Sequence, residues 1–237
     1  MKAMVIFVLF LFVGFLTTAQ DMSKSKMLKG VEVKPPVFTG VKGTLAIINT
    51  DSSSGIYDYL NEKTQYPENV AKRFIQGTTV IQFTVFPNGN LGDYRVINSV
   101  ANEIDEEVIR VLESTNGMWI PGKNNGNSVE MEKEISVIFT IDGSDHRQLA
   151  HKYYKRANKK LIKNKPKKAL RLVNYAMVYQ PYSDAILFLR ARTHLELGNS
   201  ENACKDLNRM KSLGYDYIDV YLNDFCEVEK LALVNRD

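Results

Sequence analysis

The chain has 237 residues, of which 31 are Lys or Arg and 27 are Asp or Glu, so its formal net charge is +4. A hydrophobic share of 44% and a charged share of 24% are those of a globular protein and argue against a disordered chain. The mild basic excess argues against a nucleic-acid-binding protein, which needs clustered cations with groove-reading elements. The densest basic run, Lys152–Lys168, shares its segment with apolar residues at helical spacing. We interpret it as a solvated helix face, with an anionic-lipid or polyanion patch as the alternative.

Residues 1–20 have the pattern of a signal peptide. Lys2 precedes an apolar run from Val5 to Leu16, and small residues follow it. The run is short for a membrane span, and no Cys stands at the cleavage point for lipid attachment. We therefore predict export, removal of these residues and a soluble mature chain without stable membrane insertion; a retained anchor is the alternative.

Residues 21–65 predict an extended lead-in followed by one short helix. Pro35–Gly40 favours an extended, turn-rich path, because proline fixes φ and lacks an N–H donor. Asp51–Gly55 is typical of a loop. The spacing of Ile56, Tyr59 and Leu60 then indicates a short amphipathic helix.

The next segment begins with a helix and a hairpin. Asn69–Ile75 predicts a short helix, which we expect Gly77 to end in the left-handed conformation. Thr79–Val85 alternates with period two and predicts a strand with one buried face. Asn88-Gly89 predicts a tight turn, because this pair tolerates positive φ, and the return strand is expected at Tyr94–Val100.

A second helix and a last strand complete this segment. Ile104–Leu112 carries an apolar stripe at helical spacing with acidic residues at its start. Ile135–Ile141 alternates again and predicts a strand, and Glu130, Glu132 and Glu134 upstream suggest an edge that resists unwanted pairing. For residues 66–142 the pattern predicts an α+β domain, with an antiparallel three-stranded sheet packed by two helices.

Residues 145–237 have a helical period throughout and an internal repeat of 34 residues. The pairs superimposed at that offset are Ala157 with Ala191, Ala169 with Ala203, and Val173 with Leu207. We predict an all-α stack of two helix pairs, closed by a capping helix at Tyr217–Leu231.

Cys204 and Cys226 are the chain's two cysteines. In an exported protein an even count favours a disulfide, here between the last repeat and the cap; two buried thiols are the alternative. The three histidines are not grouped with them, so we predict no metal site and no cofactor.

We expect no enzymatic activity. No Gly-x-Ser-x-Gly elbow is present. Glu130, Glu132 and Glu134 lie beside Lys133 and are explained more simply as an exposed edge than as acid–base groups. Gly122–Gly126 lacks the spacing and the strand-to-helix context of a phosphate-binding loop.

An ordered set of short motifs spans residues 66–141. It consists of Tyr66-Pro67, Gly77-x-Thr79-x-Ile81-x-Phe83-x-Val85, Pro87-Asn88-Gly89, Glu107, Trp119-x-Pro121-Gly122 and Ile138-Phe139-x-Ile141. In this order the set resembles the C-terminal domain of TonB, and Pro35–Gly40 resembles the lead-in of Bacteroidetes-type members. Thr79 departs from the Val usual in the family, and residues 41–55 look like an insertion.

The helical part resembles the tetratricopeptide repeat. Ala169, Ala176 and Pro181 fit a first unit, and Gly198 and Ala203 fit a second. The second unit departs from the pattern late, at Met210 and Tyr215. The spacing of the two cysteines is similar to that in repeats of exported Bacteroidetes proteins.

The TonB resemblance implies a periplasmic protein-binding module linked to TonB-dependent outer-membrane transport. In that family a receptor's N-terminal peptide adds as a strand to the sheet edge. The resemblance places the partner-binding residues at one sheet edge and the turn beside it: Tyr66, Pro67, Glu134, Ser136, Ile138 and Thr140. For the strand, the alternative is a closed or homodimeric edge. For Tyr66, the alternative is a helix-entry turn with its ring packed on the sheet. Trp119 is expected in the core rather than on a contact surface.

A second function from another class stays open. The chain lacks the long Pro-rich arm of a force transducer, since Pro35-Pro36 is no spacer. Without such an arm, we expect the protein to be an adaptor that binds a partner through its TonB-like domain. The alternative is a scaffold in which the repeats recruit the protein partner and the TonB-like domain is structural or dimerising. A small hydrolase or lectin-like domain in the insertion is a third, weaker alternative.

Overall fold

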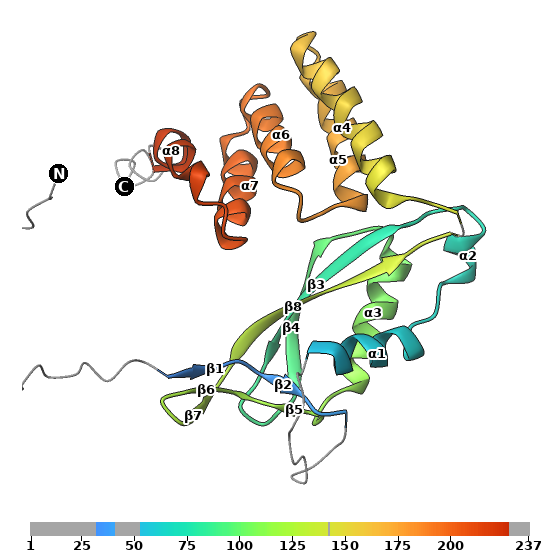
Figure 1. Ribbon diagram of the computed structural model, residues 1–237, viewed down its shortest axis with the longest axis vertical. Coiled ribbons are helices and arrows are strands. Elements are labelled where there is room, and N and C mark those ends of the chain that lie inside the picture. The colour runs from blue at the N-terminus through green and yellow to red at the C-terminus, as the bar shows by residue number, and fades with distance from the viewer. Residues whose placement is uncertain (1–31, 41–52, 142, 228–237) are drawn as a thin grey trace, which may run out of the picture. The chain divides into compact units, whose positions relative to one another are not determined.

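The computed structural model describes residues 32–40, 53–141 and 143–227 (Figure 1). The predicted signal peptide, most of the insertion after the lead-in and the end of the predicted capping helix lie outside these ranges. The protein is α+β, with antiparallel sheets and two packed helices followed by a helical stack, as the sequence predicts. In the described ranges every helix is too short or too polar to span a bilayer.

The central sheet has three antiparallel strands in the order β4-β3-β8. They are β3 (Gly77–Val85), β4 (Leu91–Asn98) and β8 (Met131–Phe139). Gly89 has φ +78° in the turn between β3 and β4, so the Asn-Gly prediction is confirmed. The prediction of one buried face for β3 is wrong, because Thr78, Val80 and Thr84 on its second face are buried too.

One face of the sheet is covered by α1 (Ser53–Lys63) and α3 (Asn102–Ser114), as Figure 1 shows. The apolar stripe of α3 is fully buried and packs with Phe83 and Ile81 in one core. Asp105 in the first turn of α3 is also buried, and it accepts hydrogen bonds from the hydroxyls of Ser99 and Thr79. This explains the polar residue at position 79: a valine there would leave the Asp105 carboxylate with one partner fewer.

The predicted first helix is shorter than expected, and Gly77 does not end it. Helix α2 covers only Glu68–Ala71, and the residue with positive φ after it is Phe74, at +55°. Gly77 is the first residue of β3. A Cβ built there would lie 2.5 Å from Cγ1 and 2.8 Å from the carbonyl oxygen of Val178. Glycine is therefore required by the close approach of a later helix, and the predicted left-handed role is wrong.

The replacement Gly77→Ala is expected to destabilise the protein by about 1–3 kcal/mol, because the added methyl group meets backbone that has little room to move. Urea denaturation followed by circular dichroism measures this. The control is Gly55→Ala, whose Cβ would lie in ordinary contact, 3.7 Å from Phe38; in a helix that change is neutral or stabilising. Equal effects of the two changes would contradict the close-packing explanation.

The lead-in joins the same layer through two small sheets. Strand β2 (Val37–Phe38) pairs with β5 (Trp119–Ile120). A second sheet contains β1 (Val33–Lys34), β6 (Gly122–Asn124) and β7 (Asn127–Val129). Phe38 and Trp119 are both buried, with ring centroids 5.3 Å apart. The extended lead-in thus contributes an aromatic side chain to the core that the sheet and its helices share.

Four antiparallel helices form the stack: α4 (His146–Ile162), α5 (Pro166–Tyr179), α6 (Asp184–Leu195) and α7 (Ser200–Ser212). The six residues paired by the 34-residue offset are all buried. Each pair thus occupies equivalent core positions. Asp145 caps α4 by accepting from the N–H groups of Arg147 and Gln148.

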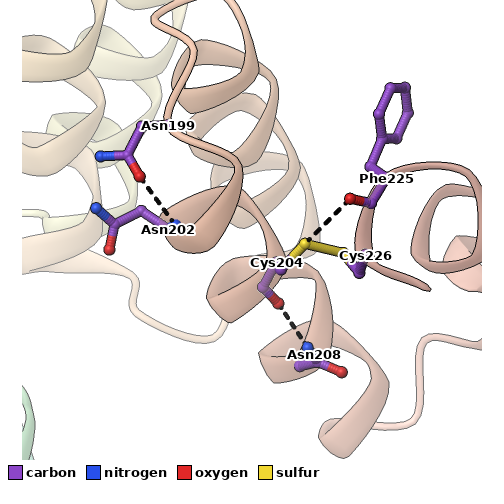
Figure 2. The surroundings of a disulfide bond; sticks show 6 residues. All are labelled: Asn199, Asn202, Cys204, Asn208, Phe225 and Cys226. Atoms are coloured by element: carbon purple, nitrogen blue, oxygen red, sulfur yellow. Dashed lines mark hydrogen bonds between the residues drawn. A yellow bond between two sulfur atoms is a disulfide. The ribbon is translucent and has the colours of Figure 1, made fainter. Parts of the chain in front are cut away.

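The end of the stack differs from the single capping helix that the sequence predicts. It contains a 3-10 turn (Asp216–Ile218), α8 (Asp219–Leu222) and a π-helical turn, η2 (Asn223–Glu227). Cys204 on α7 is disulfide-bonded to Cys226 in η2, which confirms that prediction (Figure 2). The bond therefore ties the last described turn of the chain to the stack.

Acid is expected to weaken the stack through His194. Burial lowers the pKa of His194, with Asp206 opposing and Arg190 reinforcing the shift. Its Nδ1 is buried and has no hydrogen-bond partner among the residues that the structure describes. A group with a depressed folded-state pKa stabilises the fold fully above its unfolded pKa, near 6.5, and this stabilisation is lost as pH falls. The melting temperature should therefore fall less steeply below that pH in His194→Gln, whereas the exposed control His151→Gln should follow the wild type. Parallel curves for all three proteins would contradict this.

Candidate partner-binding edge

Strand β8 has one edge that no other described strand covers. Within the part of the chain that the structure describes, β3 is the only strand paired with β8, over all nine of its residues. An unpaired strand edge exposes a row of backbone donors and acceptors that can take another strand. The candidate site is this edge, and its chemistry depends on which residues of β8 point their backbone groups outward.

The hydrogen bonds around β3 determine that direction. The N–H of Phe86 donates to the carbonyl of Asn90 on the β4 side, at 2.9 Å. Successive residues of a strand point their backbone groups to opposite sides, so Val85 and the other odd-numbered residues of β3 face β8. Val85 is paired with Met131 and the register is regular along the whole ladder. The odd-numbered residues of β8 therefore bond to β3.

Two further contacts agree with this assignment. The side-chain amide of Asn98 on β4 donates to the carbonyl of Thr78, an even-numbered residue, at 2.6 Å. The N–H of Ile141 donates to Gln76 on the β3 side, at 3.2 Å. The outward N–H and C=O groups of β8 thus belong to its even-numbered residues, which are Glu132, Glu134, Ser136 and Ile138.

The side chains of the two glutamates in this row are already bound within the protein. A carboxylate oxygen of Glu134 accepts from Arg209 on α7 at 2.5 Å, and both side chains are about three-quarters buried. Glu132 accepts from Arg95 and Gln82, at 2.6 and 2.7 Å. The interpretation of Glu130, Glu132 and Glu134 as an exposed charged edge is therefore wrong for Glu134 alone, since Glu130 and Glu132 are exposed. Glu134 instead joins the sheet to the helical stack, and at the edge it offers its backbone only.

The C-terminal half of the edge is the more open part. Ser136 lies beside Tyr182, whose ring is stacked under the guanidinium of Arg209 at 5.6 Å; burial raises the pKa of the Tyr182 hydroxyl above its usual value, and Glu134 adds to the shift. The side chain of Ile138 is 64% exposed, and Thr140, just past the strand, is exposed as well. An apolar side chain held out on an open edge is a contact point for an added segment.

The N-terminal half of the edge lies next to the lead-in. The ammonium of Lys133 donates to the carbonyl of Pro36 at 3.3 Å and lies 5.7 Å from the centre of the Trp119 ring. Burial lowers the pKa of Lys133. The sequence did not indicate this contact of Lys133 with the lead-in, nor the parts that Arg209 and Tyr182 play in this region. The contacts of Arg209 and Tyr182 join positions far apart in the chain, so no local residue spacing in the sequence could indicate these contacts.

Tyr66 and Pro67 lie at the C-terminal end of β8. The hydroxyl of Tyr66 donates to the carbonyl of Ile75 at 2.5 Å, and its ring packs edge-on against Phe139, 5.3 Å between centroids. Burial raises the pKa of Tyr66. Pro67 precedes the first turn of α2. Tyr66 is thus packed on the sheet, so any part it plays in binding is to fix the end of the edge.

A surface depression of about 540 Å³ adjoins this turn. Its lining is strongly acidic and consists of Gln65, Tyr66, Pro67, Glu68, Glu103, Glu106, Glu107 and Arg110. The guanidinium of Arg110 holds the pKa of Glu107 below its usual value, and the backbone N–H of Gln65 contributes. Among the described residues no group of three or more His, Cys, Asp or Glu side chains is arranged to hold a metal ion.

Residues 62–141 match the family model of the Gram-negative bacterial TonB protein C-terminal region. This segment is similar to a TonB C-terminal domain. The match contains α2, the three central strands and α3, and it includes the whole candidate edge. TonB C-terminal domains are periplasmic, non-catalytic modules of energy transduction or protein interaction. The match ends before α4, so the tetratricopeptide resemblance of the stack stays a prediction.

Solved TonB structures are distant from this chain. The C-terminal domain of Helicobacter pylori TonB is 17% identical, with 38% of this chain and 79% of that one covered and a TM-score of 0.32. The Pseudomonas aeruginosa TonB C-terminal domain is 21% identical, with 35% and 82% covered and a TM-score of 0.25. No curated protein matches the chain. The assignment of the TonB domain therefore depends on the family model and on the strands and helices described above.

Proposed function

We propose that the protein is an exported, periplasmic adaptor that binds a partner protein by taking a partner segment as an added strand along β8. The observation that carries the proposal is the open edge of β8, where the backbone groups of its even-numbered residues point outward. Main-chain hydrogen bonds to these groups would supply affinity, and neighbouring side chains would supply specificity. Because the domain is similar to that of TonB, we propose that the partner is the periplasmic N-terminal segment of an outer-membrane receptor.

The residues expected at the site agree with this geometry in their spacing. Glu134, Ser136 and Ile138 all have outward backbone groups, and Thr140 continues the same alternation beyond the strand. The C-terminal half of β8 is also the half that the lead-in leaves open, since Lys133 contacts Pro36 at the other end. An added strand would therefore run beside residues 134–140 and end near the turn at Tyr66.

Site-specific photocrosslinking tests the proposal directly. A photoreactive amino acid replaces Ile138 on the β8 edge, and in a matched variant it replaces Val96, which is 45% exposed on β4 at the other edge of the sheet. The full chain is crosslinked in envelope fractions, and the captured peptide is sequenced by mass spectrometry. We expect capture of one defined receptor segment at Ile138 and none at Val96. Equal capture at both positions would overturn strand addition at β8.

Proline at position 136 provides a second test. Ser136→Pro removes an outward N–H and leaves the odd-numbered residues bonded to β3, so the fold should tolerate it as other edge strands do. We expect roughly tenfold or more weaker binding of the captured segment, measured by calorimetry, because an added strand depends on these main-chain bonds. Ser136→Ala keeps the N–H and removes the hydroxyl, and it should bind like the wild type. If proline binds as well as alanine, the edge is not the binding site.

A second candidate function is a scaffold whose helices capture the partner. It is favoured by a groove of about 540 Å³ in the stack, lined by Phe188, Arg192, Leu195, Glu196, Leu207, Tyr221 and Phe225. The same crosslinker at Tyr221 distinguishes the two functions. Capture there, with none at Ile138, would assign recruitment to the helices and leave the TonB domain a structural or dimerising part.

A further inference from the structure

The α4–α5 hairpin concentrates positive charge without any acidic residue. Between Asp145 and Asp184 the chain has no Asp or Glu and eleven cations. They are Arg147, Lys152, Lys155, Arg156, Lys159, Lys160, Lys163, Lys165, Lys167, Lys168 and Arg171. The rest of the protein carries 20 Lys and Arg against 27 Asp and Glu, and is therefore acidic. The net charge of the whole chain hides this separation.

None of these eleven cations forms an ion pair with a described residue. Other helices of the protein pair their charges within one turn, as Lys72 does with Glu68 and Lys205 with Glu201. The charges of the hairpin repel one another instead. A solvated helix face normally mixes both signs, so the hairpin needs a further explanation.

The cations of α4 lie on the side away from the core. Ala150, Ala157 and Leu161 are buried against the stack, whereas Lys152, Lys155, Lys159 and Lys163 are exposed and follow one another at spacings of three, four and four. Residues at these spacings share one helix face. The result is a continuous positive stripe along the outer face of α4.

An exposed apolar residue lies among the lysines at the end of α4. Ile162, the last residue of α4, is 78% exposed, the highest value among the described large apolar side chains. Lys159, Lys160, Lys163 and Lys165 surround it in sequence. An exposed aliphatic side chain among lysines suits the boundary between phospholipid headgroups and acyl chains, where both can be satisfied together. A nucleic acid would satisfy only the charges.

The tip of the hairpin at Ile162 is remote from the start of the central sheet. The opposite end of α5 contacts the sheet, where Val178 meets Gly77. Twelve residues of helix separate Pro166 from Val178, which is about 18 Å at the ordinary helical rise. A surface bound at Ile162 would therefore be remote from the start of β3.

We propose that the α4–α5 hairpin docks the protein on an anionic phospholipid bilayer, with the lysine stripe against the headgroups and Ile162 inserted between them. This inference goes beyond the proposed function and does not depend on it, because no partner segment takes part. The basic run at Lys152–Lys168 then has the lipid-binding role that was the alternative interpretation of the sequence.

Co-sedimentation with phosphatidylcholine vesicles, with and without phosphatidylglycerol, tests the proposal on the full chain. The quantity compared is the gain in binding from phosphatidylglycerol, so that any apolar contribution common to both vesicles cancels. One variant replaces Lys152, Lys155, Lys159 and Lys163 by Gln. The matched control replaces Lys34, Lys72, Lys123 and Lys205 by Gln, which changes the net charge equally and lies outside the hairpin.

We expect the hairpin variant to lose roughly 600-fold of the gain, because each of its four lysines contributes about fivefold near an anionic surface. The control variant should keep the gain. Ile162→Ser should weaken the absolute binding to phosphatidylglycerol vesicles, because it removes the apolar contact. Equal losses in hairpin and control variants would overturn the proposal, because net charge alone would then explain binding. Full competition by soluble polyphosphate, with no effect of Ile162→Ser, would also overturn it in favour of a general polyanion site.

Discussion

Replacing Trp119 by alanine is expected to lower the free energy of unfolding by about 3–5 kcal/mol. The side chain is only 5% exposed and packs between Phe38 and Phe83, with ring centroids 5.3 and 5.6 Å away. Its Nε1–H donates to the buried hydroxyl of Thr115 at 2.9 Å. The change therefore removes a large buried ring and leaves that hydroxyl with one partner fewer.

Urea denaturation followed by circular dichroism measures the loss, since Trp119 is the chain's only tryptophan and its fluorescence disappears with it. The control is Tyr217→Ala, because that side chain is 55% exposed and its removal should cost little. Trp119→Phe should recover most of the packing and lack only the hydrogen bond. If Trp119→Ala unfolds like the control, the ring is not part of the core, and the lead-in strand would have no packing reason to stay on the domain.

Removing the disulfide is expected to cost about 3 kcal/mol. The bond joins residues 22 positions apart, and closing a loop of that length restricts the unfolded chain by an entropy of this order. The double replacement of Cys204 and Cys226 by serine should therefore lower the midpoint of urea denaturation. Wild-type protein treated with dithiothreitol should show the same loss, which separates loss of the bond from effects of the new hydroxyls.

Hydrogen exchange identifies the residues that become less protected when the disulfide is removed. The bond holds η2 on α7, and the aromatic contact between Phe188 and Tyr221, 4.9 Å between centroids, lies in the same region. Faster exchange should therefore be confined to residues 213–227, while β3 and α3 keep their protection. Uniformly faster exchange through the sheet would mean that the cap and the TonB domain unfold as one unit, contrary to this expectation.

Local signals in the sequence gave correct predictions where one residue type serves one backbone conformation or one periodic face. Asn88-Gly89 located the hairpin turn because few residues accept positive φ. The buried offset pairs, such as Ala169 with Ala203, located the core of the stack, because only small or apolar residues fit between packed helices. The disulfide followed from cysteine count and expected export. These features are determined by residues near in sequence or by a simple period.

The errors arose where a residue's role depends on a distant part of the chain. Gly77 follows a short helix and resembles a helix-ending glycine, but Val178, about a hundred residues later, is the reason for it. Glu134 resembles a solvent-exposed charge on an edge strand, but Arg209 binds it. Both partners belong to the helical stack, so the sequence of the TonB domain alone could not show either contact. The outward direction of the Ser136 backbone likewise required the register of the sheet.

The ion pair between Glu134 and Arg209 makes the edge strand and the helix α7 thermodynamically linked. A partner strand that bonds only to the backbone of β8 keeps this pair, whereas one that pulled the Glu134 side chain away would leave Arg209 with an unpaired, largely buried charge. Free-energy coupling between two sites is reciprocal. Where binding along β8 changes the free energy of this pair, a ligand that shifts α7 changes the affinity of the edge by the same factor as the edge changes the affinity for that ligand. Arg209 is then the residue through which the stack and the edge are coupled.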